Sequence, residues 1–157
     1  MKPKVYIETT VVSYLTARPS RDLVVAAHQQ ITHDWWQTCH ERFDLIASQL
    51  VIQEAGAGDP KAAQERLSVL ATLALLEVTE EALALAQKLV SAGAVPERSA
   101  EDALHIAVAV TNGVEYLLTW NCRHLANAAL RTKIEEVCRS ARYQPVIICT
   151  PEELLEA

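Results

Sequence analysis

Short apolar runs and longer amphipathic segments alternate along the whole chain. Five runs of three or four residues, rich in Val, Ile, Leu and Tyr, stand between breaks in the pattern, which is typical of strands buried on both faces. They occupy residues 5–7, 45–48, 75–78, 116–119 and 146–148. The pattern therefore predicts five short strands.

The segments between these runs have the spacing of amphipathic helices. In the longest of them the apolar residues recur at every fourth position: Leu23, Ala27, Ile31, Trp35 and Cys39. Other helices are expected at residues 11–15, up to Glu54, from Pro60, up to about Ala92, at 99–111, at 131–141 and after Thr150. The expected N-terminal caps are Thr9 with Thr10, Asp59, Thr79 and Thr150.

This alternation of strand and helix indicates the α/β fold class. Parallel neighbouring strands need crossover connections, and helices supply them on both faces of the sheet. The chain has 157 residues, which suits one domain. We therefore expect a single-domain α/β/α sandwich over residues 1–157, with a central parallel sheet of about five strands.

Composition and charge narrow the function classes. Half of the residues are apolar and the net charge is -6, so binding of nucleic acid through bulk positive charge is disfavoured. There is no signal-like N-terminus and no apolar run of membrane-spanning length, and a cytoplasmic protein is expected. The scattered cysteines form no C-x-x-C pair and are expected to be reduced and mostly buried: Cys39, Cys122, Cys138 and Cys149.

Acidic and amide side chains stand where a parallel sheet would bring them together. Glu8 directly follows the first predicted strand, and Asn121 lies just after the fourth. Glu54 lies on the helix after the second strand, and Asp102 in the first turn of the helix before the fourth. Sites in open α/β sheets lie beyond the carboxyl ends of the strands. Oxygen ligands of this kind suit Mg²⁺ or Mn²⁺, which lowers the pKa of a bound water for attack on a phosphodiester.

Each of these residues also has a structural alternative. Asp102 lies three positions after Ser99, which is the spacing of a helix capping box. Glu54 has the sequence context of an exposed helical acid, and Asn121 that of a residue shaping a turn. Glu8 fits a structural role least well, because a long acid beyond a buried strand needs partners or water.

Four segments resemble the PIN-domain family: VYIETTVVSYL, VIQE, AEDALHIAVAV and YLLTWNCRHL. The resemblance runs from Val5 to about Ile148 and implies a metal-dependent ribonuclease, of the kind that includes VapC-type toxins held inactive by an antitoxin. By this resemblance the metal-binding triad would be Glu8, Glu54 and Asp102. Asn121 would take a fourth position, and Thr9 would be the hydroxyl neighbour of the first acid.

The first acidic position departs from the family pattern, which usually has aspartate where this chain has Glu8. One extra methylene moves the carboxylate outward, and Mg²⁺ tolerates little distortion of its octahedron. Two hypotheses therefore stand. One is an endoribonuclease that uses Mg²⁺ or the more accommodating Mn²⁺, and the other is a non-catalytic PIN-like interaction module with a degenerate metal site.

Substrate and partner contacts are expected at basic and aromatic positions. Expected phosphate contacts lie in loops near the cleft: Arg18, Arg21, Arg123 and His124. His105 shares a helix face with Asp102 and has two readings, a proton donor or, more commonly, a core-edge histidine bonded to backbone. Trp35, Trp36 and Trp120 suit the core or a homodimer interface better than base stacking. The expected partners are RNA, an antitoxin and a second copy of the chain.

Overall fold

Five parallel strands form one sheet in the order β3-β2-β1-β4-β5 in the computed structural model, which describes residues 1–156. The strands are β1 (Lys4–Ile7), β2 (Asp44–Ser48), β3 (Ala74–Leu76), β4 (Tyr116–Leu118) and β5 (Ile147–Cys149). Three residues of β1, Val5, Tyr6 and Ile7, have no exposed surface, as expected for the central strand of a sheet covered on both faces.

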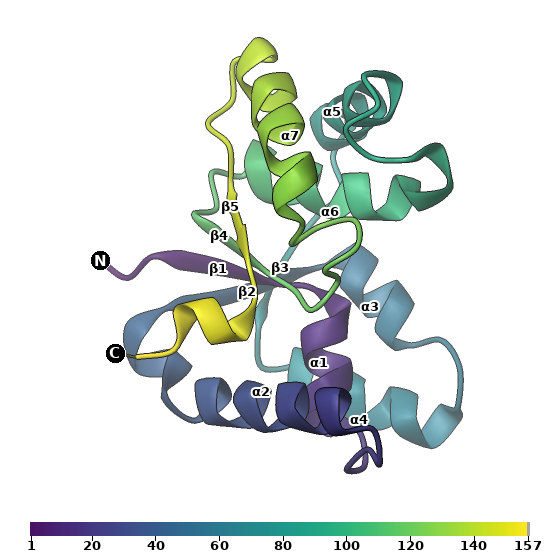
Figure 1. Cartoon of the computed structure of the whole chain (residues 1–157), viewed down its shortest axis with the longest axis vertical. Coiled ribbons are helices and arrows are strands. Elements are labelled where there is room, and N and C mark those ends of the chain that lie inside the picture. The colour runs from purple at the N-terminus through teal and green to yellow at the C-terminus, as the bar shows by residue number, and fades with distance from the viewer. Residues whose placement is uncertain (157) are drawn as a thin grey trace.

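Helices cover both faces of this sheet, so the α/β/α prediction is confirmed (Figure 1). One layer contains α1 (Thr9–Thr16), α2 (Leu23–Arg42) and α4 (Pro60–Leu70). The other contains α5 (Glu80–Ser91), α6 (Ala100–Thr111) and α7 (Ala128–Ser140). The short α3 (Gln49–Ala55) follows β2 directly, and two 3-10 turns complete the described elements, η1 (Glu97–Ser99) and η2 (Pro151–Leu154).

Most predicted element boundaries lie within two residues of the observed ones. Asp59, Thr79 and Thr150 cap helices as expected. Helix α7 begins three residues before its predicted start, because the Asn127 side chain accepts a hydrogen bond from the backbone N–H of Ala129. The predicted capping box at Ser99 is wrong: its side chain makes no capping hydrogen bond, and α6 follows the unpredicted turn η1 instead.

The three tryptophans lie in or beside the hydrophobic core. Trp35 and Trp120 are buried, and Trp36 packs at the edge of the same core, so the assignment of these rings to packing is confirmed. Among residues 1–156 there is no helix whose length and apolar character would let it cross a membrane.

The four cysteine thiols should differ sharply in reactivity. Cys39, Cys138 and Cys149 are buried, and burial raises the pKa of these thiols to about 11, about 11 and about 12. Cys122 is exposed. We expect Ellman's reagent at mildly alkaline pH to modify one thiol per native chain within minutes and all four after unfolding in urea. Rapid modification of two or more thiols in the native protein would contradict this packing.

Candidate active site

The site forms where the order of strands reverses. After β3 the chain crosses to the other side of β1, so β1 and β4 are neighbours although β2 and β3 lie between them in sequence. Ile7 pairs with Leu118 at the carboxyl ends of these strands, and the backbone N–H of Glu8 donates to the carbonyl of Leu118 at 3.1 Å. Residues that follow β1 and β4 therefore meet at the switch point of the sheet, the usual place for a ligand site.

Glu8 is held in place by hydroxyl and amide donors. Only 4 % of its surface is exposed, and its Oε1 accepts hydrogen bonds from Thr119 Oγ1 at 2.6 Å, from the backbone N–H of Thr10 at 3.2 Å and from Thr10 Oγ1. Glu8 is thus the N-cap of α1, a role that the sequence assigned to the threonines. Within the described chain Oε2 of Glu8 accepts no hydrogen bond and is the oxygen available to a ligand.

The charge of Glu8 is only partly compensated by the protein. Burial raises the pKa of this carboxyl, and the charge of His105 with the hydrogen bonds of Thr10 and Thr119 lowers it, with a net rise above the ordinary value. A cation beside Oε2 would offset the cost of an ionised carboxylate in this buried position. The chemistry of the residue therefore fits a bound metal ion.

Glu54 enters the same site from α3. Its Oε1 accepts a hydrogen bond from Nε2 of His105 at 2.8 Å and another from Oγ1 of Thr9, and the side chain is 24 % exposed. Burial raises the pKa of Glu54, but the hydrogen bond and charge of His105 outweigh it, and the net pKa is lowered. Glu54 is therefore ionised at neutral pH.

His105 connects Glu54 to the core. It is 1 % exposed, and its Nδ1 lies 2.7 Å from the hydroxyl of Tyr6, which in turn lies 2.7 Å from Oγ of Ser48. Ser48 caps α3, the helix that carries Glu54. Burial lowers the pKa of His105, whereas Glu54, Glu8 and Asp102 raise it, with a net rise. Both ring nitrogens have side-chain partners, so the prediction of a backbone-bonded histidine is wrong and His105 orients Glu54.

Asp102 and Asn121 form the other side of the site. Burial raises the pKa of the half-buried Asp102, while His105, Asn121 and His124 lower it and Glu54 raises it, with a net rise. Asp102 thus lies among these side chains. Its exposed neighbour Glu101 also reaches the site, where a side-chain hydrogen bond to Glu54 helps to lower the pKa of that carboxyl. Oδ1 of Asn121 accepts a hydrogen bond from the backbone N–H of His124 at 3.1 Å and shapes the turn after β4. The Asn121 side chain also hydrogen-bonds to Asp102, which lowers the pKa of that carboxyl.

A group of three described residues satisfies the distance requirement for a metal site. Glu8, Glu54 and His105 each offer a ligand atom, and these atoms lie within 4.8 Å of one another. Because both nitrogens of His105 are already bonded, the two carboxylates are the members free to bind a cation. Asp102 was expected in this group and instead lies beside it, where the charge of His105 and a hydrogen bond from Asn121 act on its carboxyl.

The remaining predicted residues divide between the site and its surroundings. Thr9, expected beside the first acid, donates to Glu54, and Thr10 takes the place beside Glu8. His124 lies close enough for its charge to lower the pKa of Asp102, and Arg123 is exposed in the same turn. Arg18 and Arg21 lie in the exposed loop beyond the far end of α1, about 12 Å from Glu8 along the helix.

The donors that hold the acids were missed by sequence reasoning. Tyr6, Ser48, Thr10 and Thr119 all lie within three residues of a strand end that points to the site, and Tyr6 and Ser48 act on the acids through His105. A hydroxyl side chain at such a position, in an otherwise apolar run, is the signal that was available in YIETT, IAS and LLT.

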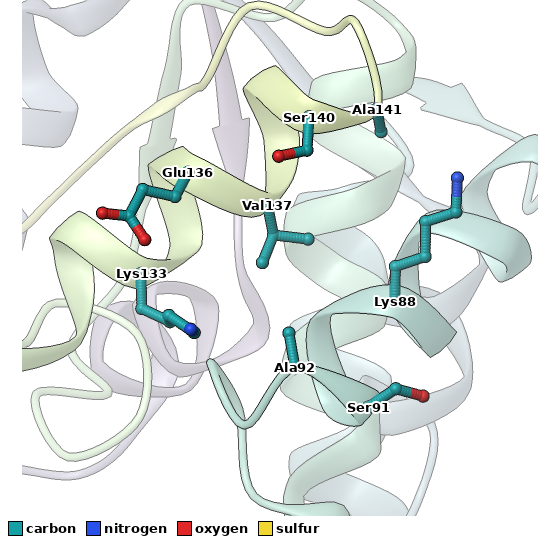
Figure 2. Close-up of a pocket in the computed structure, with 8 residues that line it drawn as sticks. All are labelled: Lys88, Ser91, Ala92, Lys133, Glu136, Val137, Ser140 and Ala141. Carbon is teal, nitrogen blue, oxygen red and sulfur yellow. The ribbon is translucent and has the colours of Figure 1, made fainter.

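The trough drawn in Figure 2 lies away from these residues. It has a volume of about 590 Å³ between α5 and α7, with Lys88 and Ser91 facing Lys133, Val137 and Ser140. Its lysines are exposed, and neither Glu8 nor Glu54 lines it. The candidate active site is therefore a cluster of buried and half-buried side chains at the sheet edge.

Comparison with known proteins gives no sequence match and a clear structural one. No protein-family model and no curated sequence matches the chain. A chain in the crystal structure of VapBC2 from Rickettsia felis, bound to a DNA fragment from its promoter, aligns with a TM-score of 0.59 and 13 % identity over 94 % of this chain and 98 % of that one. VapBC-1 from nontypeable Haemophilus influenzae gives 0.57 and 10 %, over 95 % and 98 %.

A third solved structure carries an activity in its name. VapC20 from Mycobacterium tuberculosis, described as a toxin that cleaves the sarcin–ricin loop, aligns with a TM-score of 0.53 and 14 % identity over 76 % of this chain and 92 % of that one. At these identities the likeness concerns the arrangement of strands and helices, as the sequence segments implied. This chain therefore has the PIN-like fold of the VapC proteins.

Proposed function

We propose that this protein is a metal-dependent endoribonuclease that hydrolyses RNA phosphodiester bonds. The observation that carries the proposal is the meeting of Glu8 and Glu54 at the sheet switch point, each with one oxygen fixed by donors from the protein. The fold is one on which a VapC toxin that cleaves the sarcin–ricin loop is built.

Some of these residues would bind the metal ion, and others fix the metal ligands by hydrogen bonds. Glu8, Glu54 and Asp102 would hold Mg²⁺ or Mn²⁺, with Asn121 steadying Asp102. When bound, such an ion would offset negative charge at a phosphodiester and lower the pKa of a water. Thr10 and Thr119 fix the position of Glu8, and Thr9 and His105 fix that of Glu54. Fixed carboxylates reduce the reorganisation that the reaction needs.

The biological setting that we propose is a toxin–antitoxin pair. Two of the structural neighbours are VapBC complexes, which supports an antitoxin protein as the partner of this chain. Its substrate in that setting is cellular RNA, and the compartment is the cytoplasm. The expected second copy of the chain remains part of the same proposal.

The geometry of Glu8 also supports the interaction-module hypothesis. A carboxylate that caps α1 and binds Thr119 has a structural role without any metal. In that case the protein would retain its fold and its partner but would show neither Mn²⁺ affinity nor hydrolysis. Binding and cleavage measurements with Mn²⁺ separate the two.

The test is cleavage of RNA by the purified protein with Mn²⁺, compared with EDTA and with Asp102→Asn. We expect cleavage only with the metal, and a loss of at least about 100-fold in Asp102→Asn, because the substitution removes a ligand charge. Glu97→Gln, an exposed acid-to-amide change just before α6, is the matched control and should keep full activity. Metal-independent cleavage, or full activity of Asp102→Asn, would overturn the proposal.

A further inference from the structure

Three aromatic rings stack beside the candidate active site. The rings of His28 and Trp120 are 4.1 Å apart with an interplanar angle of 12°. Tyr14 lies 6.1 Å from Trp120 and 6.3 Å from His28, with angles of 19° and 21°. Trp120 is only 8 % exposed, whereas Tyr14 and His28 are half-buried. The solvent-facing part of the stack is therefore made by Tyr14 and His28.

This stack is continuous with the residues that hold Glu8. The backbone N–H of Trp120 donates at 2.9 Å to Oγ1 of Thr10, and the same hydroxyl donates to Glu8. Tyr14 follows Thr10 by four residues on α1, so it lies on the same face about 6 Å farther along the helix. Tyr14 therefore lies one helical turn beyond Thr10, the residue that holds the first candidate ligand.

Hydrogen bonds fix the residues around the stack and hold a loop with two arginines beside it. Nε1 of Trp120 donates to Thr32 of α2 at 2.7 Å. Gln29, next to His28 and 7 % exposed, donates to the carbonyl of Arg18 at 3.0 Å and accepts the backbone N–H of Ser20 at 2.9 Å. This pair of bonds fastens the loop that presents Arg18 and Arg21 to α2 beside the aromatic rings.

We propose that Tyr14 and His28, backed by Trp120, are a stacking platform for an unpaired nucleobase of the RNA. This proposal rests on the proposed function. The base belongs to a nucleotide near the cleaved phosphodiester, and Arg18 and Arg21 contact phosphates farther along the strand. Flat aromatic side chains bind bases through their π-faces and arginines bind the backbone, a combination typical of single-strand binding. The protein therefore selects single-stranded over duplex RNA.

The experiment measures binding of a single-stranded RNA of about ten nucleotides that contains 2-aminopurine, in EDTA so that no cleavage occurs. Stacking on the platform should quench the fluorescence of 2-aminopurine when protein is added, whereas the already low fluorescence of the same RNA annealed to its complement should not change on addition of the protein. Tyr14→Leu and His28→Leu should each weaken binding by about 10-fold and reduce the quenching. Tyr14→Phe, which keeps the ring, and His33→Leu, at an exposed position of the same helix, should behave like the parent.

The outcomes separate this inference from the proposed function. Absence of quenching by the parent, or unchanged affinity in both leucine variants, overturns the platform. Loss of binding in Tyr14→Phe equal to that in Tyr14→Leu also overturns it, because the ring is then not what binds. Cleavage in Mn²⁺ with an unchanged KM in the leucine variants supports the nuclease and overturns the platform. Quenched binding without cleavage in Mn²⁺ supports the platform and overturns the nuclease.

Discussion

Replacement of Glu8 by glutamine is expected to abolish Mn²⁺ binding and to reduce RNA cleavage by at least about 100-fold while the fold persists. The amide oxygen of glutamine can still accept the hydrogen bonds of Thr10 and Thr119, so α1 keeps its cap. Burial raises the pKa of the Glu8 carboxyl, which means that its charged form is unfavourable in the folded protein. Because glutamine removes this charge, the free energy of unfolding should fall by less than about 1 kcal/mol. Calorimetric titration with Mn²⁺, urea unfolding and a cleavage assay measure the three quantities.

Glu8→Asp gives the complementary comparison. Aspartate keeps the charge and can still cap α1, but its side chain is one methylene shorter, so we expect a weaker bond to Thr119, some retained Mn²⁺ affinity and a loss of stability. Parent-like Mn²⁺ binding by Glu8→Gln would show that this carboxylate is not a ligand. Absence of Mn²⁺ binding and hydrolysis in the parent and in Glu8→Asp alike would favour the interaction module.

Replacement of His105 by alanine is expected to lower the free energy of unfolding of the metal-free protein by about 2–4 kcal/mol. The substitution leaves a cavity at a fully buried position and removes partners from the Tyr6 hydroxyl and from Glu54. Urea unfolding followed by tryptophan fluorescence gives the value. His33→Ala, an exposed histidine-to-alanine change on α2, should stay within about 0.5 kcal/mol of the parent.

The stability gained from His105 should depend on pH in a defined direction. Burial lowers the pKa of His105, but Glu54, Glu8 and Asp102 raise it above the ordinary value of 6.5. A group whose pKa is raised on folding contributes fully below its unfolded pKa, and the contribution is lost as the pH rises through the folded value. The parent should therefore exceed His105→Ala by more at about pH 6 than at about pH 9. A difference that grows with pH would contradict the protonated His105–Glu54 pair.

The fold could be predicted from the sequence because its determinants are local. Buried strands show as apolar runs, and the caps Asp59, Thr79 and Thr150 mark helix starts through bonds to residues two or three positions away. The acids Glu8 and Glu54 were found in the same way, because each follows a strand or lies on the helix just after it.

The contacts that define the site could not be predicted, because they join distant parts of the chain. Thr119 reaches Glu8 only because β4 lies beside β1, and His105 reaches Tyr6 and Glu54 only once α6 packs against the sheet. Spacing along the helix placed His105 near Asp102 and gave no indication of Glu54. The three-residue spacing of Ser99 and Asp102 predicted a capping box that does not form. Ser99 is the last residue of a 3-10 turn, and its side chain makes no capping hydrogen bond.

The bond between Glu8 and Thr119 couples energetically two positions that are 111 residues apart. A shorter acid at position 8 would weaken this bond, and loss of the hydroxyl at position 119 would remove a donor from a buried carboxylate. Substitutions at the two positions should be strongly non-additive.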